Sequence, residues 1–292
     1  MQSLDLVRLK NLMKITRGRK EIIIGLIDGP IFVSHKELSH ENIRVISREI
    51  SGTCTQASSI ACIHGTFVAG ILNAKRGGLA PAISPNCTLL VRPIFTEISG
   101  SVQMPSAIPQ ELAKAIIQTI EAGAHLINLS VAIARPSLKG EKELGAALNY
   151  AAKRGVIVVA AAGNQGTIGS STITRHPWVI PVVACDIQGR VTRESNLGRS
   201  IATHGLASPG ENIISLGTDG NPLSLGGTSV ATPFVTGAIA LLWSCFPKAT
   251  ATEIKFAITH AQKSMRKSIV PPLLDAWSAY QLLTKSYVYS AK

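Results

Sequence analysis

Residues 227–233 read Gly-Thr-Ser-Val-Ala-Thr-Pro and run directly into the apolar stretch Phe-Val-Thr-Gly-Ala-Ile-Ala-Leu-Leu-Trp at residues 234–243. The pattern predicts a turn followed by a buried helix, with Ser229 in the first helical turn. A hydroxyl there lies beside free backbone N–H groups and the positive end of the helix macrodipole, a favourable place for a developing oxyanion. Ser229 is therefore a candidate nucleophile, although the position also suits a serine that only caps the helix.

The chain before this helix alternates apolar runs with amphipathic segments. Two helical patterns, at residues 109–122 and 141–154, each end at a glycine. Strands that alternate with helices of this size predict an α/β fold with a central, mostly parallel sheet flanked by helices. Four runs without polar alternation are typical of such buried strands: residues 21–27, 89–93, 126–130 and 156–161.

Weaker patterns complete the chain. No linker or internal repeat divides it, so we expect a helical extension at residues 1–19 and a single domain at residues 20–292. The weaker patterns predict helices at residues 4–17, 252–261 and 273–283, and short strands at residues 179–184 and 213–216.

Two more polar residues stand at the ends of predicted elements. Asp28 follows the first strand, where open α/β sheets place their sites. His64 precedes small and apolar residues that let a helix enter the core. Taken alone, Asp28 is better explained by a turn before Gly29-Pro30, and His64 by a buried structural histidine. With Ser229, however, they complete the set required for acyl transfer.

The order of these residues, Asp then His then Ser, differs from that of α/β-hydrolases and of chymotrypsin-like enzymes. The motifs are His-Gly-Thr-Phe-Val-Ala-Gly at residues 64–70, Ala-Ala-Ala-Gly-Asn at residues 160–164, and the stretch at residues 227–233. In this order they resemble the motifs of subtilisin-type (subtilase) serine endopeptidases, over roughly residues 20–283. The resemblance implies a three-layer fold with a mostly parallel sheet between helices.

The resemblance also implies a role for each candidate residue. Ser229 attacks the peptide carbonyl, His64 takes and returns its proton, and Asp28 orients the imidazole. Asn164 and the Ser229 backbone N–H hold the oxyanion. No cofactor is implied. The loop at residues 73–78, where many relatives bind calcium, reads Asn-Ala-Lys-Arg-Gly-Gly and carries cations where oxygen ligands are needed, so we expect no required metal there.

A peptide or precursor protein is the partner that the resemblance implies, bound as an extended strand between two edges of the chain. Main-chain pairing of this kind suits unfolded segments. The implied substrate-binding residues are Ser130, Val131 and Ala132 on one edge, Gly100 and Ser101 on the other, and Ala162 and Gly163 beside the oxyanion site.

The sequence departs from the usual family pattern at two places that bear on function. The Asp-Gly-Pro turn at residues 28–30 lacks the hydroxyl that usually follows the aspartate, and Ala132 replaces a common glycine at a pocket wall. The turn, with Ser34-His35 and parts of residues 78–95, resembles the cyanobactin-type maturation proteases. Those relatives cut precursor peptides of ribosomally made natural products, so the narrower resemblance implies precursor processing.

Composition argues against other classes of function. The net charge of +12 could suit nucleic acid, but aromatic residues make up only 4% and no nucleic-acid module is visible, so we expect a solvated basic face. The N-terminus lacks a signal-type apolar region and no run is long enough to cross a bilayer, so we expect a cytoplasmic protein. An odd number of cysteines without zinc-ligand spacing favours free thiols: Cys54, Cys62, Cys87, Cys185 and Cys245.

The leading interpretation is an intracellular serine endopeptidase that processes a precursor peptide. A non-catalytic or gated subtilase-like peptide-binding protein stays open, since the hydroxyl after Asp28 is missing. A general degradative intracellular subtilisin stays open as well. The sequence leaves the oligomeric state unknown.

Overall fold

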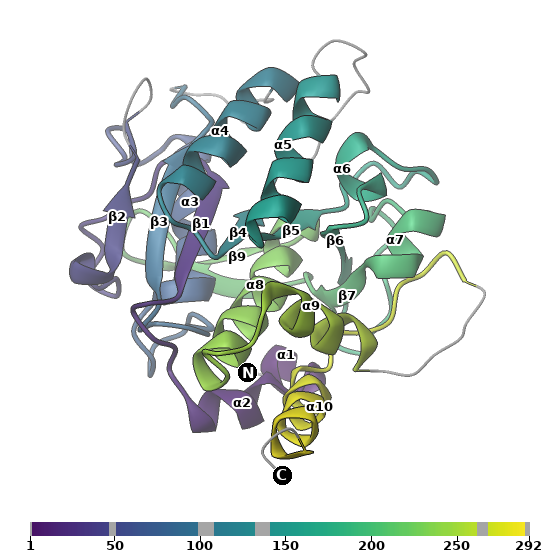
Figure 1. Ribbon diagram of the computed structural model, residues 1–292. Helices are drawn as coiled ribbons and strands as arrows, with labels where there is room; N and C mark the ends of the chain where they lie inside the picture. The colour runs from purple at the N-terminus through teal and green to yellow at the C-terminus, as the bar shows by residue number, and fades with distance from the viewer. Residues whose placement is uncertain (1, 47–50, 99–107, 132–140, 262–267, 290–292) are drawn as a thin grey trace.

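A seven-stranded parallel sheet organises the computed structural model, which describes residues 2–46, 51–98, 108–131, 141–261 and 268–289. Helices cover both faces of this sheet (Figure 1), which confirms the expected α/β class. The strand order is β2-β3-β1-β4-β5-β6-β7. The strands are β1 (Ile23–Asp28), β2 (Ile43–Val45), β3 (Thr88–Pro93), β4 (Leu126–Leu129), β5 (Ile157–Ala161), β6 (Val179–Cys185) and β7 (Leu206–Pro209).

The order in which the strands are added to the sheet changes direction at β1. This strand pairs in parallel with β3 on one side and with β4 on the other. Three helices make the crossovers between the central strands: α3 (Ile60–Asn73), α4 (Pro109–Glu121) and α5 (Glu141–Arg154). Ligands of open α/β sheets bind outside the carboxyl ends of the strands at such a reversal, so the end of β1 is where a site is expected.

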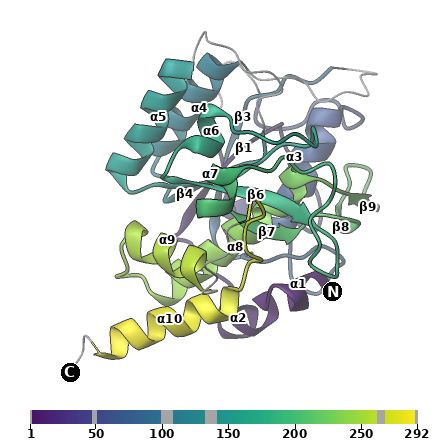
Figure 2. The ribbon, with the colours of Figure 1, turned by 90° about the vertical axis from the view of Figure 1, so that its right-hand side faces the viewer.

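The helices form one layer on each face of the sheet. One apolar cluster joins α4 and α5 to the sheet, and a second joins α3 and α8 (Thr228–Cys245) to the other face. α8 is long and apolar enough to span a membrane, contrary to the expectation that no run has that length, but 89% of it is buried inside the protein, as in a core helix. Four outer helices pack around it (Figures 1 and 2): α1 (Gln2–Leu6), α2 (Leu9–Ile15), α9 (Ala251–His260) and α10 (Ala276–Tyr289).

The N-terminal segment differs from the single helix predicted there. Arg8 takes a left-handed backbone conformation with φ 54° and divides the segment into α1 and α2. Val7 and Leu9 are both fully buried, and residues two apart cannot face one side of a continuous helix. α1 and α2 pack in the same apolar cluster as α8. The domain boundary at residue 19 stays a sequence-based prediction.

The edges of the sheet also differ from the sequence patterns. The predicted strand at residues 213–216 forms, but it pairs antiparallel with β9 (Pro222–Leu225) in a separate two-stranded sheet as β8 (Ile213–Leu216). The main sheet instead ends in β2 and β7, which are too short to give a periodic signal. Three short helical segments were also not predicted: η1 (His40–Asn42), α6 (Thr172–Arg175) and α7 (Arg199–His204).

Arg76 ties the N-terminal helices to the loop that follows α3. Its guanidinium donates hydrogen bonds to four backbone carbonyls, those of Met13, Thr16, Ala82 and Ile83. Burial lowers the pKa of Arg76 to about 10, with a smaller effect from Arg17. The half-buried Arg76 side chain therefore cross-links the end of the N-terminal segment and the loop that follows α3 through backbone carbonyls.

Replacing Arg76 by methionine should lower the free energy of unfolding by about 3–5 kcal/mol, since four carbonyls lose a charged donor. Chemical denaturation measures the change. Lys75→Met is the matched control, because the neighbouring Lys75 is exposed and donates only to the Lys36 carbonyl within the described residues. Equal losses in the two variants would contradict this role for Arg76.

Candidate active site

Asp28 ends the central strand β1 and is completely buried. Its Oδ1 accepts a hydrogen bond of 2.6 Å from the Gly29 N–H. Its Oδ2 is also buried and has no hydrogen-bond partner among the described residues. One carboxylate oxygen is thus held by the backbone, and it is this oxygen that the next residue of the site contacts.

The glycine after Asp28 is required by the packing of α3. A Cβ built on Gly29 would lie 2.0 Å from the carbonyl oxygen of Ala61, and one on Gly65 would lie 2.5 Å from that of Pro30. Two backbones therefore meet where no side chain fits. A side chain at position 29, where the family usually has serine or threonine, would therefore collide with the backbone of the first turn of α3.

His64 lies on α3 and bridges the other two predicted residues. Its Nδ1 is 2.8 Å from Asp28 Oδ1, and its Nε2 is 2.9 Å from Ser229 Oγ. The histidine is only 8% exposed. Burial by itself lowers the pKa of His64, but the charge and hydrogen bond of Asp28 outweigh it, so the net pKa lies above 6.5.

Ser229 lies in the first turn of α8, as the sequence predicted. Gly227 precedes this helix with φ 119°, a conformation that favours glycine. N–H groups in a first turn have no partner within the helix. The Ser229 hydroxyl therefore lies beside both His64 and the donor-rich start of α8.

Asn164 follows β5 and is fixed to the same helix start. Its Oδ1 accepts a hydrogen bond of 2.9 Å from the Thr228 N–H, and the neighbouring Gly163 N–H donates to Thr228 Oγ1 at 3.2 Å. Asn164 is exposed. Because Asn164 Oδ1 already accepts from Thr228, the amide nitrogen is the group of this side chain that can donate to another acceptor.

The predicted substrate-binding residues fall partly within the described chain. Ser130 and Val131 follow β4, and Ala162 and Gly163 follow β5, so both pairs lie at the carboxyl edge of the sheet. All four are buried. Three others lie outside the described residues: Gly100, Ser101 and Ala132.

A cavity of about 350 Å³ adjoins Ala161 and Ala162. Glu141 and Arg175 line it with opposite charges 3.9 Å apart. These two residues could not be found from the sequence, because they belong to no motif and only the folding of separate segments brings them together. Gln165 and Asn196 also line the cavity. Gln165 directly follows the Asn164 motif and could have been found from it, whereas Asn196 could not.

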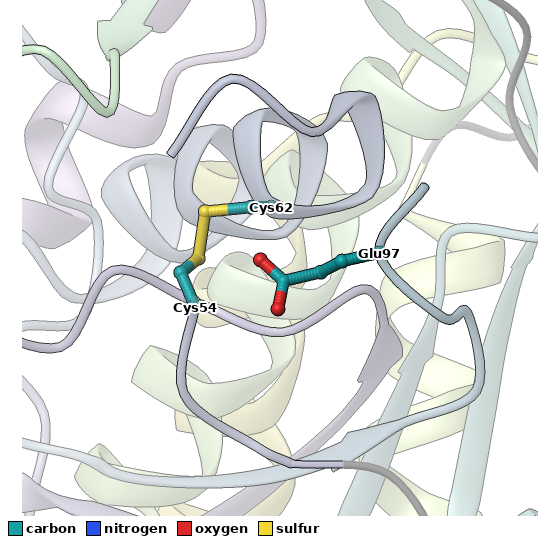
Figure 3. Close-up of side chains that lie close together, drawn as sticks. All are labelled: Cys54, Cys62 and Glu97. Atoms are coloured by element: carbon teal, nitrogen blue, oxygen red, sulfur yellow. A yellow bond between two sulfur atoms is a disulfide. The ribbon is translucent and has the colours of Figure 1, made fainter. Parts of the chain in front are cut away.

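Cys54 and Cys62 are joined by a disulfide (Figure 3), so the expectation that all five cysteines are free thiols is wrong. The pair forms because the loop before α3 folds back on the first turn of that helix, which an eight-residue spacing does not reveal. Cys87, Cys185 and Cys245 are free, and burial raises their pKa values to about 11, 12 and 11.

Glu97 lies beside this disulfide, with ligand atoms of the three side chains within 4.8 Å of one another (Figure 3). The joined sulfurs offer no thiolate for a metal ion. The Glu97 carboxylate instead accepts hydrogen bonds from the Thr55 N–H and hydroxyl and from the Gln56 N–H. The disulfide and the Glu97 carboxylate thus both hold the loop before α3. The disulfide joins the helix at Cys62, two residues before His64.

Comparison with known proteins adds independent information. The model of the subtilase family matches residues 19–276. A thermostable alkaline protease of Halalkalibacterium halodurans is 33% identical over 193 residues, 66% of this chain and 50% of that protein, so the chain spans about half its length. Among solved structures, the protease domain of PatA has a TM-score of 0.83 at 26% identity, covering 92% of this chain and 97% of that one.

A second solved structure, the prenylagaramide maturation protease PagA, has a TM-score of 0.78 at 26% identity, covering 94% of this chain and 98% of that one. PatA is itself a patellamide maturation protease. These similarities confirm the narrower resemblance that the sequence predicted from its Asp-Gly-Pro turn.

Proposed function

The chain belongs to the subtilase family of serine proteases, and on this premise we propose that Ser229, His64 and Asp28 carry out peptide hydrolysis, with Asn164 assisting. The observation that supports the proposal best is the position of His64. Its two ring nitrogens lie 2.8 Å from Asp28 Oδ1 and 2.9 Å from Ser229 Oγ. These are the hydrogen-bond distances expected when a base links a nucleophile to an orienting carboxylate.

The proposed reaction follows from the contacts of His64. As Ser229 Oγ attacks the peptide carbonyl, His64 Nε2 takes its proton, and Asp28 stabilises the imidazolium through Nδ1–H. The same proton then passes to the leaving amine. A water molecule, deprotonated by His64, hydrolyses the acyl-enzyme and restores Ser229.

Asn164 and the start of α8 are proposed to stabilise the oxyanion. The tetrahedral intermediate places a negative charge on the former carbonyl oxygen. The Ser229 N–H belongs to a first helical turn, and Asn164 is anchored to the same turn by Thr228. Both donors are therefore in place before the substrate binds, so little reorganisation opposes charge development.

The proposed substrate is a precursor peptide bound in extended form along Ser130 and Val131. Maturation proteases such as PatA and PagA, similar to this chain over at least 92% of its length, support this substrate class. The cavity lined by Glu141 and Arg175 lies beside the proposed oxyanion site and would receive a side chain next to the cleaved bond.

The proposed role of His64 predicts how activity depends on pH. Only the neutral imidazole can take the Ser229 proton, so activity should rise with pH as His64 deprotonates, with a midpoint above 6.5. In Asp28→Asn the carboxylate that raises the pKa is gone, and the midpoint should fall. The pH profile of kcat/KM measures both, and a midpoint that does not move would argue against the contact between Asp28 and His64.

A cleavage screen tests the proposed substrate class. The purified protein is incubated with a proteome-derived peptide library and with unfolded casein, and the products are identified by mass spectrometry. A processing protease should cut a few related sequences and leave casein largely intact. Broad cleavage of both would indicate general degradation instead, and cleavage that persists in Ser229→Ala would exclude this site as its source.

A further inference from the structure

Pro233 removes a hydrogen bond from the residue proposed as nucleophile. In an α-helix the carbonyl of each residue accepts from the N–H four positions later. For Ser229 that position is 233, a proline inside α8 that has no N–H. The motif at residues 227–233 therefore leaves the Ser229 carbonyl without its helical partner.

The Ser130 hydroxyl takes the place of the missing N–H. It donates a hydrogen bond of 3.0 Å to the Ser229 carbonyl oxygen. Ser130 follows β4 and is only 4% exposed, so this contact joins the carboxyl end of a central strand to the first turn of α8. A carbonyl shielded from water is costly to leave without a donor, and this part-buried contact supplies the donor from outside the helix.

Two fully buried side chains fix the direction of the Ser130 hydroxyl. Asn128 Nδ2 donates to Ser130 Oγ at 2.8 Å. Thr236 Oγ1 lies 2.8 Å from Asn128 Oδ1, nearer than its other acceptor, the Thr232 carbonyl, at 3.2 Å. Because Ser130 Oγ accepts from Asn128, its own proton is directed to the Ser229 carbonyl.

We propose that Ser130 is a positioning residue, whose hydroxyl replaces the N–H that Pro233 lacks and holds Ser229 within reach of His64. The inference rests on the proposed function, since it assumes that Ser229 is the nucleophile. An N–H at position 233 would compete for the same carbonyl oxygen. The contribution of the Ser130 hydroxyl therefore depends on the presence of proline at 233.

This dependence is tested by the rate at which a fluorophosphonate probe labels Ser229, which needs no knowledge of the substrate. Four proteins are compared with the wild type: Ser130→Ala, Pro233→Ala, the double variant, and Ser208→Ala. Ser208 is the matched control, because it is a fully buried serine on β7 whose hydroxyl has no partner within the described chain. Circular dichroism establishes that each variant is folded at the assay temperature.

Ser130→Ala should be labelled about tenfold more slowly or worse, since the half-buried Ser229 carbonyl loses the donor that replaces its helical partner, whereas Ser208→Ala should stay within about twofold of the wild type. The double variant should stay within about threefold of Pro233→Ala, because the restored N–H takes over. The pH midpoint of labelling should be unchanged in Ser130→Ala, since Asp28 and His64 keep their contact.

Two results would overturn the inference: Ser130→Ala labelled as fast as Ser208→Ala, or an equal loss from Ser130→Ala with and without Pro233. If Pro233→Ala does not fold, the comparison of Ser130→Ala with Ser208→Ala still decides. A folded wild type that is not labelled at all would instead count against the proposed function.

Discussion

His64→Ala is expected to reduce kcat on the order of 10⁶-fold, the magnitude known for this kind of change in subtilisin itself and carried over here. Among the described residues the imidazole is the hydrogen-bond partner of the Ser229 hydroxyl, so without it no base takes the proton. Some acceleration over the uncatalysed reaction should persist, about 10³–10⁴-fold, from substrate binding and oxyanion stabilisation.

The measurement uses a peptide that the wild type cleaves, with kcat and KM determined separately. KM should change little, because His64 contacts Asp28 and Ser229 and not the strand ends proposed to bind substrate. His40→Ala is the matched control, since His40 is an exposed histidine of η1 and should retain wild-type rates. A loss confined to KM would contradict the assignment of His64 as the base.

Asn164→Ala should lower kcat by about 10²–10³-fold, a magnitude that is likewise known from subtilisin itself. The amide donor acts on the charge of the transition state, so KM should change far less than kcat. The measurement is again steady-state kinetics on a cleaved peptide. Gln165→Ala serves as the control, because its side chain lines the neighbouring cavity and should affect KM instead.

A second substitution separates the two functions of the Asn164 side chain. Asn164→Asp keeps an oxygen to accept from the Thr228 N–H but removes the donor and adds a negative charge. The loss in kcat should be at least as large as in Asn164→Ala. If the aspartate variant instead recovered activity, Asn164 would act only by holding the start of α8.

The central strands of the sheet and the residues of the candidate site could be predicted from the sequence for a physical reason. Strands buried on both faces are continuous apolar runs, and each of the residues Asp28, Asn164 and Ser229 lies at the end of such a run or the start of a buried helix. Parallel strands bring their carboxyl ends to one edge. Local sequence therefore fixed both the elements and the edge at which these side chains meet.

The features that were missed depend on contacts between distant segments. The Cys54–Cys62 disulfide requires the loop before α3 to fold back, and Arg76 meets carbonyls from a helix about sixty residues earlier. The break at Arg8 follows from the opposing burial of Val7 and Leu9. None of these gives a periodic pattern or a motif, since each is decided by tertiary packing.

The position of covalent labelling tests the central claim, that Ser229 is an activated nucleophile, most directly. The folded protein is treated with a fluorophosphonate, digested, and analysed by mass spectrometry, alongside Ser229→Ala. The account predicts one adduct, on Ser229, which is absent from the variant. An adduct on another residue, equal labelling of the variant, or no adduct on the folded wild type would contradict it.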